Sequence, residues 1–137
     1  MVVSLHVATG GLVGALAGSR PRALVLGLVA HAVGDAIPHQ DVSSRTFETL
    51  SGVACLGVLA AAHGPASPVV LGAIGGSSPD LEHVIRLARP GGRKLFPSHR
   101  VRGWHRSGGL PASLQLLAAG AIVGALAAGR LYGRVGR

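Results

Sequence analysis

Residues 2–18 read VVSLHVATGGLVGALAG, a run without a lysine, arginine or acid in which glycines and alanines are mixed with leucines and valines. Further apolar stretches follow, each bounded by prolines, glycines or charged residues, at 23–37, 47–62, 68–76 (continuing in polar form to 88) and 111–128. Such stretches approach the roughly 17–25 residues that cross a bilayer core, and glycine and alanine let helices approach closely. We therefore predict an all-α fold, a small polytopic membrane protein with about five transmembrane helices.

The composition supports this prediction. The 137 residues are 48% apolar and only 13% charged, and the mean hydropathy is +0.48. So few charged residues are not enough to cover the water-facing surface of a soluble domain. The alternative is a soluble bundle of very apolar helices. We predict one membrane-embedded helical domain over residues 1–137, with a basic site loop at 86–109 within it. No basic residue precedes the first stretch, so we expect it to be retained rather than cleaved as a signal peptide.

The charge balance is strongly basic. Lysine and arginine number 13 against five acids, and the net charge is +8. The basic residues lie between apolar stretches, without a long run and with almost no aromatic residues for base stacking, so we expect no nucleic acid partner. Contact with membrane or substrate phosphate is the better interpretation. The single Cys55 excludes a disulfide within the chain and a cysteine-based zinc site.

Two short segments combine histidine with carboxylates. Residues 31–41 read HAVGDAIPHQD, where His31 and Asp35 are four apart on one helical face and Pro38 turns His39 out of the helix. Residues 75–83 read GGSSPDLEH, where Asp80 and His83 are three apart. Imidazole and carboxylate on one face suit zinc or manganese. A His–Asp pair at a helix end, and an ordinary Ser-Pro-Asp helix start, are the alternatives.

A third segment, HRVRGWHRS at residues 99–107, places two histidines among arginines; a solvated basic loop is its alternative interpretation. With five spans, His6 and all three segments lie on one side of the membrane, and His63 lies on the other. Ionisable groups near hydrocarbon indicate a functional site. We predict that a divalent metal, zinc with manganese as the alternative, is held by His6, His31, Asp35, His39, Asp80, His83, His99 and His105.

These residues resemble a known family, the predicted membrane-bound metal-dependent hydrolases. That family has a PD-x-D-H element after a glycine-rich helix and an HR-x-x-T-H-S element in the following loop. The resemblance covers residues 75–107 and His6; Glu82 stands where the family has its second Asp, and His99 and His105 are one residue further apart. A shorter likeness relates residues 31–35 to the His-x-x-Gly-Asp helix of zinc-dependent phospholipases C and nucleases. Both resemblances imply metal binding.

The function that we predict is metal-dependent hydrolysis at a membrane surface, with a small phosphoester or a phospholipid as substrate. The metal would activate a water molecule, Asp35 or Glu82 would take the remaining proton, and the phosphate would bind Arg100, Arg102 and Arg106. Membrane lipid is the expected partner, and the oligomeric state stays open. A metal or proton transporter and a non-enzymatic membrane assembly subunit are the alternatives.

The distribution of basic residues predicts the orientation. The site side carries eight, namely Arg45, Arg86, Arg89, Arg93, Lys94, Arg100, Arg102 and Arg106. The other side carries five, namely Arg20, Arg22, Arg130, Arg134 and Arg137. The positive-inside rule then puts the site in the cytoplasm, with the protein in the plasma membrane. If the three arginines assigned to substrate binding are left out, the two sides carry the same number of basic residues and the rule does not predict an orientation.

Overall fold

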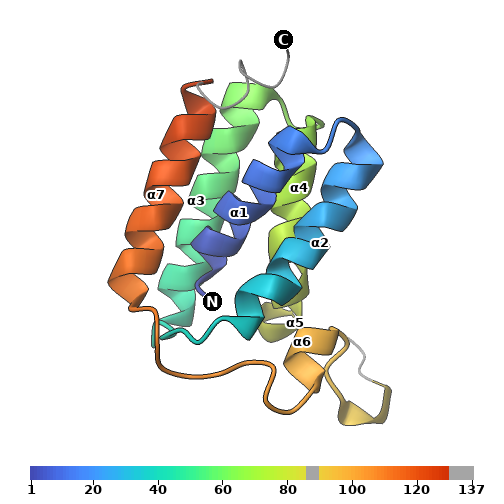
Figure 1. Cartoon of the computed structure of the whole chain (residues 1–137), viewed down its shortest axis with the longest axis vertical. Coiled ribbons are helices and arrows are strands. Elements are labelled where there is room, and N and C mark those ends of the chain that lie inside the picture. The colour runs from blue at the N-terminus through green and yellow to red at the C-terminus, as the bar shows by residue number, and fades with distance from the viewer. Residues whose placement is uncertain (86–89, 130–137) are drawn as a thin grey trace.

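The protein is all-helical in residues 1–85 and 90–129, which are the residues that the computed structural model describes. The long helices of this part are α1 (Val3–Leu16), α2 (Arg20–Ala36), α3 (Arg45–His63), α4 (Pro68–Ser77) and α7 (Ala112–Ala127) (Figure 1). Shorter pieces are η1 (Ser78–Asp80), α5 (Leu81–Val84), η2 (Pro90–Gly92) and α6 (Pro97–Arg100). The all-α prediction is confirmed. Arg86 and Arg89 of the predicted site loop, and Arg130, Arg134 and Arg137, lie outside the described residues.

The helix boundaries follow local signals that the sequence carries. The Ser44 hydroxyl accepts a hydrogen bond from the Phe47 N–H at 3.2 Å, and Ser67 caps α4 in the same way. Serine at this position satisfies an N–H group that the first turn of a helix leaves unpaired. α2 has Pro21 in its first turn and ends at Ala36, just before Pro38, as predicted. Each predicted apolar stretch therefore contains one long helix.

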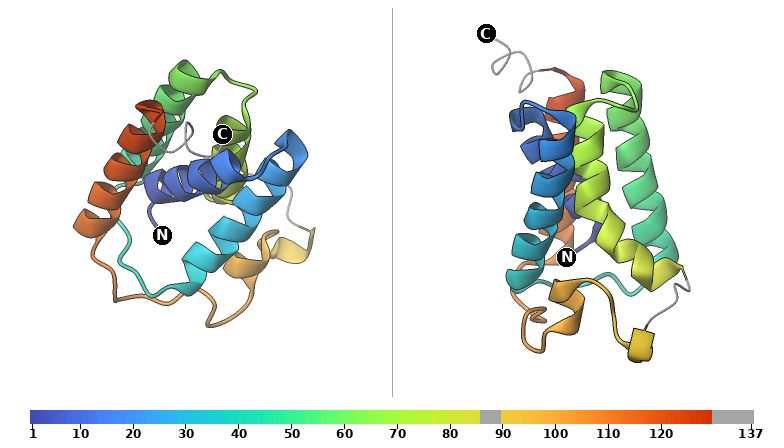
Figure 2. Two further views of the ribbon diagram at one scale, coloured as in Figure 1. Left: turned by 45° about the horizontal axis from the view of Figure 1, so that its top comes forward. Right: turned by 90° about the vertical axis from the view of Figure 1, so that its right-hand side faces the viewer.

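The long helices run alternately up and down (Figures 1 and 2). The start of α1, the α2–α3 connection, η1, α5, α6 and the start of α7 lie at one end of the bundle, which we call the site end. The segments that the sequence predicted to share one side thus do lie together. His63 lies at the end of α3, away from the site end, with Nε2 2.9 Å from the Leu126 carbonyl oxygen.

α4 packs most extensively against α1 and α2, and glycine makes this possible. A Cβ atom on Gly10 would overlap the Gly72 carbonyl oxygen, and one on Gly14 would overlap the Pro68 carbonyl oxygen. The backbones of α1 and α4 therefore touch directly, as in close helix pairs of membrane proteins. We call the successive contacts the glycine ladder; they join Gly10 to Gly72, Gly14 to Pro68, and His6 to Gly76.

Large apolar side chains point outward, while small ones fill much of the interior. On α2 the buried face carries Gly27, His31 and Asp35, whereas Val33 is 58% exposed. On α7, Leu117 is 69% exposed. Within the described residues, α3 is the one helix long and apolar enough to cross a membrane, with 19 residues and a hydropathy of 1.3; α1 and α7 are shorter apolar helices.

Candidate metal centre

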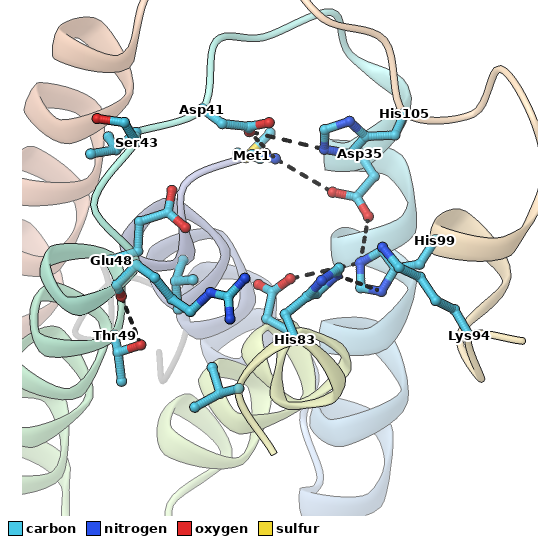
Figure 3. Close-up of a pocket in the computed structure, with 15 residues that line it drawn as sticks. Met1, Asp35, Asp41, Ser43, Glu48, Thr49, His83, Lys94, His99 and His105 are labelled. Atoms are coloured by element: carbon cyan, nitrogen blue, oxygen red, sulfur yellow. Dashed lines mark hydrogen bonds and ion pairs between the residues drawn. The ribbon is translucent and has the colours of Figure 1, made fainter. Parts of the chain in front are cut away.

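The carboxylate of Asp35 lies among histidines from three segments of the chain. Asp35 and His31 occupy the last turns of α2, His6 lies in the first turns of α1, and all three are buried. Nε2 of His6 lies 3.2 Å from Asp35 Oδ1, and Nε2 of His31 lies 3.1 Å from Oδ2. His99 of α6 brings its Nε2 to 3.3 Å from the same Oδ2 (Figure 3). The folded chain thus joins residues 6, 31, 35 and 99, as the sequence predicted for one site.

His31, His39 and His99 are held in the same way. In each ring, Nδ1 is hydrogen-bonded to an oxygen that can only accept, so Nδ1 carries a proton. In the neutral ring, the lone pair is then on Nε2, which is directed at the site. Metal-binding histidines are commonly oriented by such a hydrogen bond. The acceptors are the Gly76 carbonyl at 2.8 Å for His31, the Ile37 carbonyl at 2.6 Å for His39, and Glu82 Oε1 at 2.5 Å for His99.

The histidine nitrogens also converge in pairs. Nε2 of His31 lies 3.2 Å from Nε2 of His99, and Nε2 of His39 lies 2.9 Å from Nε2 of His105. Two lone pairs at this distance repel each other unless a proton or a cation lies between them. Two nitrogens on one tetrahedral zinc ion are about 3.3 Å apart, given Zn–N bonds of about 2.0–2.1 Å. The first pair therefore has the separation of two ligands on one ion.

The candidate ligands form two centres that share Asp35. The inner centre has overlapping groups of three whose ligand atoms lie within 4.8 Å of one another: His6, His31 and Asp80; His31, Asp35 and His99; and Asp80, His83 and His99. The outer centre has one such group: Asp35, His39 and His105. All eight residues that the sequence predicted as metal ligands belong to these groups, which are positioned to hold a metal ion.

Unpaired polar atoms in the inner centre fit a metal. Among the described residues, Nδ1 of His6 and Oδ2 of Asp80 are buried and have no hydrogen-bond partner. A buried polar atom without a partner is costly, and coordination of a cation would remove that cost. The set of imidazole nitrogens and carboxylate oxygens suits zinc and, with more oxygen ligands, manganese.

The outer centre has a further carboxylate and the amino group of Met1 close to it. Oδ1 of Asp41 lies 3.2 Å from Nε2 of His39 and 4.0 Å from Nε2 of His105, so Asp41 can join this centre. The amino group of Met1 lies against Nε2 of His39 and 3.6 Å from Asp35 Oδ1. His105 is 38% exposed in its side chain, whereas His39 is buried.

Two supporting residues were not predicted. The Ser98 hydroxyl donates to Asp35 Oδ2 at 2.5 Å, and both groups are buried. Gln115 of α7 accepts from the Val2 N–H at 3.0 Å and donates to the carbonyl oxygens of Gln40, at 2.8 Å, and Leu110, at 3.0 Å. Gln115 thereby ties the loops beside His39 and His105 to the bundle. A lone glutamine in an apolar stretch was the available signal in the sequence.

The surroundings shift the pKa values of the groups at the site end. Burial raises the pKa of Asp80 to about 6. Burial alone would lower the pKa of His99, but hydrogen bonds with Asp35 and Glu82 outweigh it and leave this pKa above its usual value. Burial would raise the pKa of Glu82, but hydrogen bonds from the Leu95 N–H and from His99 bring it below its usual value. Asp80 and His99 thus both hold a proton to a higher pH than these side chains usually do.

A cavity of about 460 Å³, which we call the polar chamber, opens beside both centres (Figure 3). Asp35, Asp80, His99 and His105 line it on one side, and Asp41, Ser43, Arg45, Glu48, Thr49 and Lys94 also line it. The predicted phosphate ligands lie elsewhere: Arg100, Arg102 and Arg106 are exposed and do not line the chamber in the described part of the chain. Arg100 instead lines a separate depression with Arg93, Lys94 and His99.

Comparison of the sequence with family models and curated proteins, and of the fold with solved structures, finds no match.

Proposed function

We propose that this protein is a membrane-embedded, metal-dependent hydrolase that acts on a phosphoester. The observation that carries the proposal is the shared orientation of His31, His39 and His99. Each ring donates its Nδ1–H to a fixed acceptor and directs Nε2 at Asp35 or at another histidine. Helix caps or a solvated loop would give no reason for this arrangement of buried rings. The resemblance of residues 75–107 to the membrane-bound metal-dependent hydrolases supports the same function.

The outer surface supports a membrane location. Large apolar side chains are exposed along α2, α3 and α7, and they include Val25, Val29, Val33, Leu50, Val53, Leu114 and Leu117. A soluble bundle would direct such residues inward and cover its outer face with charges. The direct backbone contacts of the glycine ladder suit helices packed within lipid. The spans are short, so we expect the bundle to lie in a locally thinned bilayer, with the site end at the headgroups.

The chemistry follows from the ligands. A divalent ion at the inner centre would lower the pKa of a water molecule toward neutrality. Glu82 accepts from both the Leu95 N–H and His99, so it is a positioning residue rather than a proton acceptor. Asp80 lines the chamber, has an unpaired Oδ2 and a pKa of about 6. Asp80 is thus suited to accept a proton from the attacking water. Both oxygens of Asp35 already lie against histidines or Ser98, so Asp35 is the less suitable proton acceptor.

The proposed reaction is a simple displacement at phosphorus. The water oxygen forms a bond to phosphorus, and the bond from phosphorus to the departing alkoxide oxygen breaks. The proton that Asp80 takes from the water is returned to that departing oxygen. Arg45 and Lys94, which line the chamber, would balance the negative charge of the phosphate during this step.

The test uses purified protein in mild detergent. Wild type should contain stoichiometric divalent metal and should hydrolyse bis-p-nitrophenyl phosphate, with activity lost to a chelator and restored by zinc or manganese. His31→Ala should lose the ion of the inner centre together with the activity, and His63→Ala, at the opposite end, should keep its metal and its activity. Protein that binds metal and moves it across proteoliposomes without hydrolysis would favour the transporter. Protein without metal would refute the proposal.

A further inference from the structure

An apolar groove of about 190 Å³ lies beside the polar chamber, between α3 on one side and α4 with α5 on the other. Val3 and Val7 of α1 form its floor, and Val53 and Ile74 lie on its opposite walls. We call it the side groove. Apart from Thr49, Ser77, Ser78 and Asp80, its lining is formed by apolar side chains and Gly52. Such an apolar lining suits an apolar group and offers few hydrogen-bond partners to a purely polar substrate.

The side groove and the polar chamber adjoin each other and share four lining residues. Val3, Thr49, Asp80 and Val84 line both of them. Asp80 is also a candidate ligand of the inner centre. A molecule that occupied both cavities would therefore have an apolar part between the helices and a polar part beside the metal ligands.

The two cavities differ sharply in charge. Arg45, at the start of α3, and Lys94, in the segment before α6, both line the chamber. These cations suit an anionic group close to the metal ligands. The rim of the side groove instead carries exposed apolar residues, with Val53 62% exposed and Val84 49% exposed. Under the proposed function this rim faces the hydrocarbon of the bilayer, so the groove opens toward lipid.

We propose that the substrate is a phospholipid that enters from the side. One acyl chain lies in the side groove, and the phosphate lies in the polar chamber between the inner centre and the cations of Arg45 and Lys94. This inference rests on the proposed function, because it names the substrate class of the same site. The apolar groove, the lining residues that it shares with the chamber, Asp80 among them, and the cations in the chamber support this inference.

The experiment compares two p-nitrophenyl phosphodiesters that share one leaving group, the methyl ester and the dodecyl ester. Wild type should have a kcat/KM for the dodecyl ester that is at least about tenfold higher, since burial of only two methylene groups would account for that ratio. Val53→Trp should fill the groove and lower kcat/KM for the dodecyl ester about tenfold, while the methyl ester is unaffected.

The matched control is Val58→Trp, on the same helix, 48% exposed and outside the lining of the groove. It should leave both esters unchanged, which corrects for partition of the dodecyl ester into detergent micelles. If Val53→Trp does not fold, Ile74→Trp fills the groove from α4 and should have the same effect.

The possible failures are distinct. If wild type cleaves neither ester with any divalent metal, the proposed function is wrong. If wild type cleaves both esters, but Val53→Trp or Ile74→Trp affects them equally or not at all, the acyl-chain assignment is wrong and the hydrolase stands. Equal loss of dodecyl-ester activity in Val58→Trp would also overturn the assignment, because that residue does not line the groove.

Discussion

Glu82 holds the ring of His99 in place. Its Oε1 accepts a hydrogen bond from Nδ1 of His99 at 2.5 Å, while Nε2 of the same ring lies 3.3 Å from Asp35. Glu82 is buried and is fixed in turn by the Leu95 N–H at 2.6 Å. The carboxylate therefore acts on the site through a histidine, which assigns it a role that the sequence alone did not distinguish from proton transfer.

The first prediction concerns this pair. Glu82→Ala should weaken metal binding roughly 10–100-fold, because His99 loses the acceptor that sets its tautomer and orientation. Glu82→Gln should lose much less metal affinity, because its amide oxygen can still accept the hydrogen bond from Nδ1 of His99. Competition with a chromophoric chelator measures the affinity. Equal affinities in the alanine variant and wild type would show that Glu82 does not position the ligand.

The second prediction concerns stoichiometry. We expect one ion at the inner centre and a second at the outer centre, because Asp35 is shared between the two groups. His105→Ala should lose only the outer ion, and His31→Ala should lose only the inner ion. Asp35→Ala should weaken the binding of both ions. Asp80→Ala and His83→Ala should lower the amount of metal bound at the inner centre. His63→Ala should leave the metal content unchanged. Elemental analysis of the purified variants checks this, and loss of both ions in His105→Ala would contradict two separate centres.

The third prediction is the pH dependence of metal binding. A metal requires His99 neutral and Asp80 ionised. The pKa of His99 is above its usual value and that of Asp80 is about 6, so lowering the pH through this range protonates both ligands. Affinity should fall as the pH decreases through the pKa of Asp80, about 6, by up to about tenfold per pH unit for each ligand that takes up a proton. Isothermal titration at several pH values measures it, and a constant affinity would contradict the assignment of these ligands.

The fourth prediction separates two sets of cations. Arg45→Gln and Lys94→Gln should each raise KM for a phosphodiester about tenfold, because both side chains line the chamber. Arg22→Gln, at the start of α2 and away from the site end, is the control that should not change KM. The sequence instead assigned phosphate binding to Arg100, Arg102 and Arg106. A larger effect of Arg102→Gln than of Arg45→Gln would favour that earlier assignment.

The fifth prediction is orientation. In a Cys55→Ser background, Ala66→Cys places a thiol in the α3–α4 turn, and Gln40→Cys places one at the site end; both positions are exposed. If the site faces the cytoplasm, a membrane-impermeant maleimide should label Ala66→Cys on intact cells and Gln40→Cys only after lysis. The opposite labelling would reverse the orientation and leave the site itself unaffected.

Much of the fold could be predicted because local signals determine it. Apolar stretches bounded by prolines, glycines or charged residues predicted the long helices. The alternation of these helices predicted that His6 and the segments 31–41, 75–83 and 99–107 would lie on one side. The four-residue spacing of His31 and Asp35 was enough to place them on one face. These inferences depend on helix geometry and chain direction, which a sequence expresses directly.

Other features depend on contacts between distant segments. Gln115 bonds the Val2 N–H across 113 positions of the chain, and no local pattern specifies that contact. Phosphate binding is a similar case. The sequence pointed to the arginines of residues 100–106, which are close together in the chain, but the fold brings Arg45 and Lys94, from two other segments, to the lining of the chamber. The side groove likewise lies between several helices, and no sequence pattern within a single helix predicts it.

The glycine ladder also determines where this chain can accept changes in length. One residue inserted in α1 between Gly10 and Gly14 would rotate the preceding turns by about 100° relative to the rest. His6 would then turn away from Asp35, and side chains would meet the α4 backbone where only glycine fits. An insertion in the α3–α4 turn, at residues 64–67, would leave every one of these contacts in register. We therefore expect the protein to accept insertions and deletions in that turn without loss of the site, and not to accept them in α1 or α4.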